Sequence, residues 1–191
     1  QSVLIKRRLV YMTAKLKQNL TKVKDPGSAL THFIAMILAI IAAMPLLMKA
    51  VRDSGQFHVS ALTIFILSMI GLYAASTIYH TLDISPKINQ MLRKIDHMMI
   101  FILIAGTYTP VCMVVLGDKT GWSLLTLVWG IAIVGILINA LWITCPKWFS
   151  SLIYIAMGWV CVLAITKILD SMPKAGFMWL LTGGIIYTVG G

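Results

Sequence analysis

Charged residues are scarce in this sequence, and glutamate is absent altogether. Charged side chains make up 12% of the 191 residues, too few to cover the surface of a water-soluble protein of this size. Without glutamate, the H-E-x-x-H helix of zinc metalloproteases cannot form. The three cysteines, Cys112, Cys145 and Cys161, show no C-x-x-C spacing, and we interpret them as small core residues.

Hydrophobic residues are abundant instead, at 59% of the chain, and the mean hydropathy is +0.90. They form recurring runs of about twenty residues, the length that an α-helix needs to cross a bilayer. Short segments rich in Gly, Pro, Asp or Ser separate the runs and leave no room for a second globular domain. The sequence therefore predicts an all-α membrane protein with six transmembrane helices, at about residues 28–50, 58–80, 95–116, 122–143, 149–169 and 175–191.

The first 27 residues differ from the rest because they are basic and lack a long apolar run. We interpret residues 1–27 as a partly amphipathic helix on the membrane surface, ended by the turn residues Asp25-Pro26-Gly27, and residues 28–191 as the transmembrane domain. The net charge of +10 resides mostly in this arm and in the loops. That placement indicates lipid head groups as the partner of the basic residues, rather than nucleic acid.

The distribution of basic residues predicts the orientation of the bundle. Eleven of them lie on the side of the N-terminus and five on the other side, so the positive-inside rule places the N-terminus in the cytoplasm of a multi-pass protein of the cell membrane. The last predicted helix has 17 residues and stops at Gly191, short of the roughly 20 needed for a comfortable crossing. We therefore expect the chain to continue.

Ionisable groups gather at the predicted cytoplasmic ends of the helices: His32, His80, Asp96 and His97. Such groups in membrane helices are costly and by default indicate a functional site. Ser76 lies one helical turn before His80, on the same face, where its hydroxyl could hold a metal-bound water or orient an imidazole. Zinc binds imidazole nitrogen and carboxylate oxygen, so we expect a zinc site with His80 and Asp96 as ligands.

Each of these residues also has an ordinary structural interpretation. A histidine at the end of a span can sit in the membrane interface, and a serine can bond its own helix or a neighbouring one. Asp96 could cap the N-terminus of its helix. His32 and His97 are weaker candidates for ligands, since packing would explain them equally well. His80 and Asp96 alone are fewer ligands than zinc requires.

Two stretches rich in small residues predict close helix packing. These are I-A-G-T-Y-T-P, from Ile104 to Pro110, and T-G-G-I-I-Y-T-V-G-G, from Thr182 to Gly191. Membrane helices approach one another closely through such residues, and threonine hydroxyls can bond carbonyls that a proline frees.

Together, these stretches resemble the hemolysin III group of the progestin and adipoQ receptor family, whose members include the adiponectin receptors. The resemblance covers almost the whole chain after the basic arm. It is carried by "ALTHFIA" (Ala29 to Ala35), "STIYH" (Ser76 to His80), "RKIDHMMIFILIAGTYTP" (Arg93 to Pro110) and "GGIIYTVG" (Gly183 to Gly190). The S-x3-H box followed at this spacing by Asp-His and A-G-T-Y-T-P is specific in combination.

The resemblance implies a bundle of seven helices with a cytoplasmic N-terminus, in the plasma membrane of a bacterium. It implies a zinc ion near the cytoplasmic side, with Ser76 and His80 in the S-x3-H box and Asp96 at the acidic position. The remaining ligands in the family are two histidines on the seventh helix, beyond Gly191. On its own, the 191-residue chain is therefore expected to bind zinc poorly.

Three functions stay open at this point. The family is similar to ceramidase-type hydrolases, which implies zinc-activated water attacking a lipid amide or ester, with Ser76 and Asp96 as catalytic groups. Alternatively, zinc is structural in a receptor-like or membrane-sensing protein and fastens helices together. A channel or hemolytic pore is disfavoured, because the predicted spans are too uniformly apolar to line a water-filled path.

Overall fold

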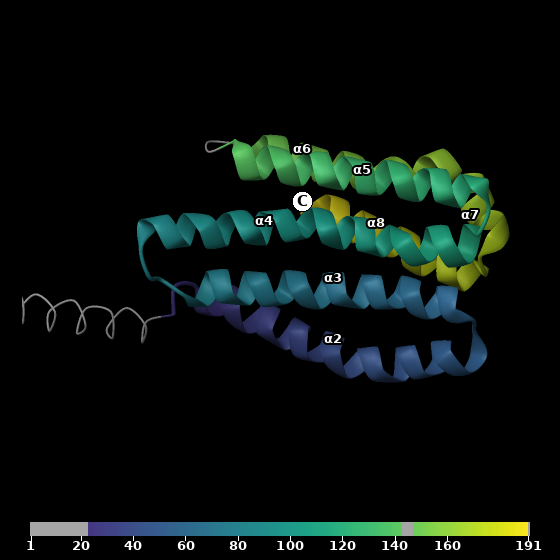
Figure 1. Ribbon diagram of the computed structural model, residues 1–191, viewed down its shortest axis with the longest axis horizontal. Helices are drawn as coiled ribbons and strands as arrows, with labels where there is room; N and C mark the ends of the chain where they lie inside the picture. Colours follow the sequence, from purple (N-terminus) through teal and green to yellow (C-terminus); the bar gives the residue numbers. More distant parts are fainter. Residues whose placement is uncertain (1–22, 143–146, 191) are drawn as a thin grey trace, which may run out of the picture.

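The computed structural model describes residues 23–142 and 147–190, and every regular element in these ranges is helical (Figure 1). The elements are α2 (Pro26–Asp53), α3 (Gln56–Thr81), α4 (Pro86–Pro110), η1 (Val111–Leu116), α5 (Lys119–Leu141), α6 (Lys147–Trp159), η2 (Val160–Ala164), α7 (Ile165–Ser171) and α8 (Lys174–Gly190). α4 runs on into η1, and α6, η2 and α7 follow one another as a single segment. The predicted all-α fold with six helical segments is confirmed.

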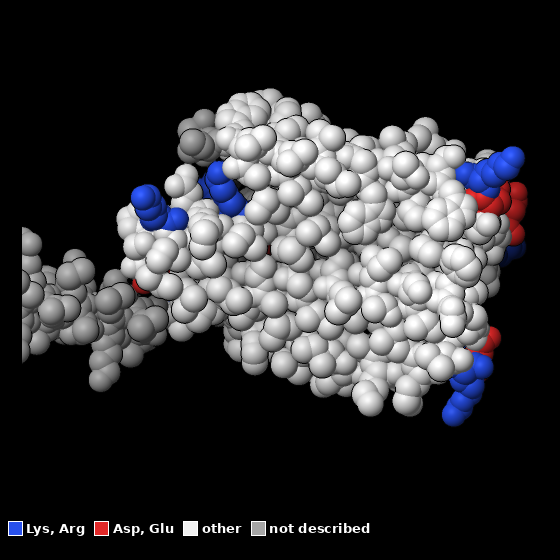
Figure 2. All heavy atoms as spheres, in the orientation of Figure 1, with Lys and Arg blue, Asp and Glu red and all other residues white. Residues whose placement is uncertain are grey.

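Five of the segments in the described ranges are long and apolar enough to cross a membrane. α8, with 17 residues, is shorter. Many large apolar side chains on the five segments are exposed, such as Ile41, Leu67 and Leu141, and only a bilayer accommodates so much exposed apolar surface. Figure 2 shows that Lys, Arg and Asp side chains gather toward the two ends of the bundle, with a broad uncharged face between them.

The helices pack in chain order around α4. α2 packs against α3, α3 against α4, and α4 against α5, while α6 contacts α4, α5 and α8. In Figure 1, α2 and α3 lie on one side of α4 and α5 and α6 on the other. The buried core forms between α4, α5 and the α6–η2–α7 segment, around Phe101, Val128, Met157 and Ile168.

The predicted packing of I-A-G-T-Y-T-P is confirmed. Gly106 faces α3 so closely that an added Cβ would lie 2.1 Å from Ser68 Oγ. Thr109 donates a hydrogen bond to the carbonyl of Ala105 (2.9 Å) and accepts one from Trp129 Nε1 (3.3 Å). The second stretch differs, because a Cβ added at Gly183 or Gly184 of α8 would meet none of the described atoms within 4 Å.

Several helix starts differ from the sequence prediction. The third span begins at Pro86 instead of residue 95, since Ser85 caps it and its polar first turns remain helical (Ser85 Oγ to Ile88 N, 3.3 Å). The first begins at Pro26, so Asp25-Pro26-Gly27 is a helix start with a proline at N1 and not a turn that ends the arm. Residues 1–22 of the predicted arm, and Cys145, lie outside the described residues.

Two spans are not the uniform α-helices that periodicity predicts. After Pro110 the third span continues as the π-helical η1 and ends at Gly117, whose φ of 60° suits glycine. The fifth is interrupted by the 3₁₀-helical η2. Both irregular stretches border the core between α4 and α7.

Candidate functional site

The start of α2 and the end of α3 are joined at one end of the bundle, which we call the histidine end. The backbone N–H of Asp25 donates to the carbonyl of His80 (2.9 Å), and that of Lys24 donates to Thr81 (3.3 Å). The side chains meet as well, with His80 Nδ1 3.2 Å from Asp25 Oδ2. A carboxylate from one helix thus holds the imidazole of the next.

A second histidine bonds across the same two helices, one turn deeper. His32 Nδ1 and Ser76 Oγ form a short hydrogen bond, and Ser76 is 2% exposed. The rings of His32 and His80 lie edge to face, with centroids 5.6 Å apart. The structure therefore brings together His32, Ser76 and His80, and the neighbour that Ser76 orients is His32 rather than His80.

Asp25 also caps α2. Its carboxylate accepts a hydrogen bond from Ser28 Oγ (2.8 Å), and this bond, opposed by partial desolvation and aided by the nearby His80, keeps the pKa of Asp25 below its usual value. The carboxylate is therefore ionised at neutral pH and able to accept the Nδ1–H of His80. Beside this pair, Lys24 lies over the ring of Tyr79, 3.7 Å from its centroid.

The remaining predicted residues are placed differently. Asp96 lies half-buried well inside α4, so the alternative that it caps a helix is wrong. Within the described part of the chain no hydrogen bond or ion pair engages its carboxylate. The carbonyl of His97 accepts a hydrogen bond from Tyr154 (2.9 Å). His58 lies in the first turn of α3, at the opposite end from His80.

The donor types at the histidine end fit zinc, but their number does not complete a site. His80, with Nδ1 on a carboxylate, leaves Nε2 for a metal, and this arrangement is common among metal-binding histidines. Across residues 23–142 and 147–190, however, no three His, Cys or Asp side chains are arranged to hold one ion. The described residues alone therefore do not form a complete zinc site.

Sequence reasoning missed Asp25, which it assigned to a turn. The available signal was topological: two antiparallel helices joined by a short loop place the start of the first beside the end of the second. An aspartate at the start of α2 and a histidine at the end of α3 are therefore neighbours although they are 55 positions apart in the sequence.

All residues of the histidine end lie within the part of the chain that resembles known proteins. The model of the haemolysin-III related family matches residues 20–191, from before Asp25 to the end of the sequence. The chain belongs to the haemolysin-III related family. It is 37% identical over 180 residues to hemolysin-3 of Bacillus cereus, covering 94% of this chain and 82% of that protein. It is 36% identical over 167 residues to the hemolysin-3 homolog of Bacillus subtilis strain 168, covering 87% and 78% respectively. No solved structure gives a significant match.

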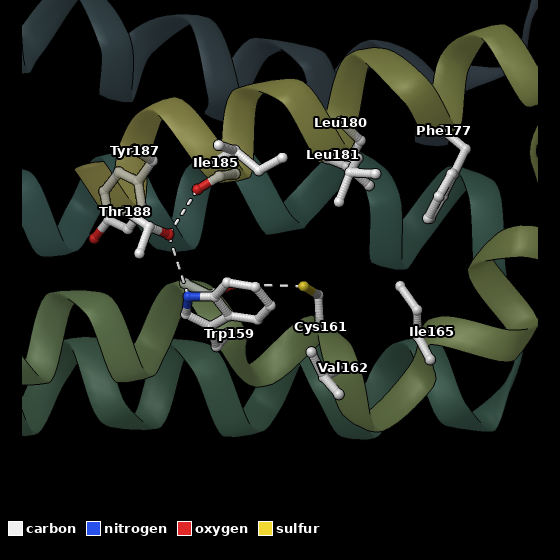
Figure 3. Close-up of a pocket in the computed structure, with 12 residues that line it drawn as sticks. Trp159, Cys161, Val162, Ile165, Phe177, Leu180, Leu181, Ile185, Tyr187 and Thr188 are labelled. Carbon is white, nitrogen blue, oxygen red and sulfur yellow. Dashed lines mark hydrogen bonds between the residues drawn. The ribbon is translucent and has the colours of Figure 1, made fainter. Parts of the chain in front are cut away.

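This haemolysin-III related chain also has two apolar cavities, away from the histidine end. The larger, about 360 Å³, lies between α4, η1, the α6–η2–α7 segment and α8 and is lined by Tyr108, Gly158 and Trp179 among others. The smaller, about 90 Å³, lies between the α6–η2–α7 segment and α8 (Figure 3). A hydrogen bond from Trp159 Nε1 to Thr188 Oγ1 (3.2 Å) joins two of the residues that line it. Ile104, at the near edge of the larger cavity, lies eight positions, or about 12 Å, along the helix from Asp96.

Proposed function

We propose that this membrane protein binds zinc at the histidine end and uses it to hydrolyse an amide or ester bond of a membrane lipid. The observation that carries the proposal is the pairing of His80 Nδ1 with Asp25 at 3.2 Å. Such a carboxylate fixes the tautomer and the direction of an imidazole whose other nitrogen binds a metal.

His80 is the proposed principal ligand, and His32, held by Ser76, is the second imidazole within reach of the same place. Further ligands come from beyond Gly191 on a seventh helix, as the resemblance to the receptor family implies. Zinc, when bound, would lower the pKa of a water molecule and polarise a carbonyl.

Asp96 is the proposed group that holds or deprotonates this water. Its carboxylate is half-buried on α4, the helix that packs against α3, and is not committed to another described side chain. A carboxylate at a membrane depth where charge is costly is more readily explained by a reaction than by stability. Ser76 contributes by orienting His32.

A structural role for zinc is the second candidate, and one observation favours it. The two pairs, His80 with Asp25 and His32 with Ser76, already fasten α2 to α3, and the two apolar cavities described above lie toward the other end of α4. A receptor-like or membrane-sensing protein needs only a closed site of this kind. We place the histidine end on the cytoplasmic side in either case, from the excess of basic residues there.

The test uses the natural full-length protein in lipid vesicles that contain a ceramide or an ester analogue as substrate. Hydrolysis that disappears with a chelator, returns with zinc and falls at least about 100-fold in Asp96→Asn supports the hydrolase. Stoichiometric zinc without hydrolysis, together with a lower unfolding temperature after chelation, supports the structural role. A full-length protein that is purified without zinc and cannot take it up would contradict both the hydrolase and the structural role.

A further inference from the structure

The fifth span is broken in the middle of the bundle, and a side chain from another helix fills the break. The hydroxyl of Tyr108, on α4, accepts a hydrogen bond from the backbone N–H of Cys161 (2.8 Å). Its single proton lies within hydrogen-bond reach of two carbonyl oxygens, that of Gly158 at 2.7 Å and that of Met157 at 3.1 Å. One phenol group therefore joins both sides of the break.

The position of the hydroxyl explains why the helix is interrupted. In a continuous α-helix the N–H of Cys161 would bond directly to the carbonyl of Met157, four residues earlier. Tyr108 is inserted between these two groups, and side chains inserted in this way are an established cause of helix kinks. The chain responds with the 3₁₀ turn η2 and resumes as α7.

A cavity borders the break on one side, and α8 packs closely against α6 just before it. Tyr108 lines the larger cavity together with Gly158 and Cys161. Tyr187 of α8 lies against Gly158 so closely that an added Cβ would be 2.7 Å from its ring. Three positions after Tyr108, α4 changes to the π-helix η1, which contacts α7. Figure 3 shows α8 facing the broken segment, with Trp159 and Thr188 directed toward each other.

We propose that the break is a hinge between α6 and α7 and that the hydroxyl of Tyr108 is its latch. With the hydroxyl inserted, the segment has one bent shape. With the hydroxyl withdrawn, Cys161 and Met157 can bond directly, and α7 changes its angle to α6. The hydroxyl is the switch because, in the apolar interior, the backbone groups of the break must be satisfied by one arrangement or the other. This inference is independent of zinc.

The direct test measures the angle between α6 and α7 by pulsed electron spin resonance in lipid nanodiscs. Spin labels replace the exposed Leu152 and Leu169, 17 positions apart, or about 26 Å along a helix. The natural cysteines are changed to alanine, which keeps the backbone N–H of residue 161. We expect one narrow distance distribution for the otherwise unchanged protein. In Tyr108→Phe a second distance should gain about fivefold in population, the factor that corresponds to one net hydrogen bond.

Tyr154→Phe is the matched control, because it also removes a buried hydroxyl that links α6 to α4, by the bond to His97, but lies away from the break. It should leave the distribution unchanged. The distance between labels within the regular helix α5, at Leu127 and Leu141, should be unchanged by both substitutions. An unchanged distribution in Tyr108→Phe, or equal changes in both tyrosine variants and both label pairs, would overturn the hinge.

A measurement on the unsubstituted protein does not depend on the variants folding. Amide hydrogen exchange should be faster by about tenfold or more in residues 160–165 than in the middle of α5, because a hinge opens locally and more often than the bundle unfolds. Equal protection of the two segments would contradict the proposal.

Discussion

The two ends of the bundle are built alike but contain different bases. At the histidine end, Asp25 caps α2 and pairs with His80 from the end of α3. At the opposite end, Asp118 caps α5, accepting from the N–H of Gly121 (3.0 Å), and pairs with Lys167 of α7 at 2.7 Å. In each case one aspartate completes a helix N-terminus and also fastens a second helix.

The difference between the two bases decides what each end can do. Lysine at neutral pH has three protons and no free electron pair, so the Asp118–Lys167 pair is a fastening and nothing more. Histidine held by a carboxylate at one nitrogen keeps the other free for a metal or a proton. The same backbone arrangement therefore provides an ion pair that joins two helices, Asp118–Lys167, at one end and a candidate metal site at the other.

Cysteine labelling from outside the cell should give opposite results at the two ends of the bundle. A single cysteine at Asn89, in the first turn of α4, should be protected from a membrane-impermeant thiol reagent added outside intact cells, and one at Asp118 should react fully. The reason is the excess of basic residues at the histidine end. The reverse pattern would place the candidate site outside the cell.

Zinc content should show the next largest contrast. His80→Ala should weaken zinc binding by the natural full-length protein by orders of magnitude, since each lost imidazole removes a ligand from the site. His58→Ala is the matched control, because it removes a histidine from the same helix at the other end. Metal analysis after dialysis against graded chelator measures both, and equal retention of zinc would take His80 out of the site.

Asp25 should matter less than His80 but still measurably. Asp25→Asn keeps a capping oxygen at the start of α2 and removes the charge that orients His80. Loss of such an outer carboxylate typically costs about 10- to 100-fold in metal affinity. We expect a loss in this range from competition titrations with a zinc indicator, with little change in unfolding temperature. Unchanged affinity would mean that the Asp25–His80 pair only fastens helices.

The sequence predicts the helices well because their signal is local. Twenty-residue apolar runs are properties of single segments. The position of Ser76 and His80 near the end of one helix follows in the same way. The start of α4 was nevertheless predicted nine residues too late, because its polar first turns lie outside the apolar run. The break at Cys161 could not be predicted, because the hydroxyl that causes it belongs to Tyr108, which lies 53 positions away. Asp25 was missed for the same reason, since its partner is on another helix. Pairing of this kind depends on packing, which no single segment specifies.

Gly106 tests the packing that holds α3, and with it His80, against α4. In Gly106→Val, the added side chain would enter the space of Ser68, with even a Cβ only 2.1 Å from its hydroxyl oxygen. Overpacking of this kind costs about 1–3 kcal/mol, measured as a lower unfolding temperature in detergent. Gly130→Val, where an added Cβ would meet none of the described atoms within 4 Å, is the control and should be nearly neutral. Equal loss in both would indicate a general penalty for removing glycine from these helices.

The smallest expected effect on stability comes from the Asp118–Lys167 ion pair at the opposite end. The hydrogen bond from Lys167, followed by that from the Gly121 N–H, holds the pKa of Asp118 at about 2, below its usual 3.8. A carboxylate with a lowered pKa stabilises the folded state fully above about pH 4, and this stabilisation is lost as the pH falls toward 2. Asp118→Asn should therefore flatten the dependence of the unfolding temperature on pH in that window and leave zinc binding unchanged.

At pH 7 the effect of Asp118→Asn on stability should be slight, because both side chains are about half exposed and water and salt screen such pairs. Asn still caps α5, and Lys167 keeps its bond to Thr120. A large loss of stability at pH 7, or any loss of zinc, would show that the two ends are coupled through the bundle and not independent fastenings.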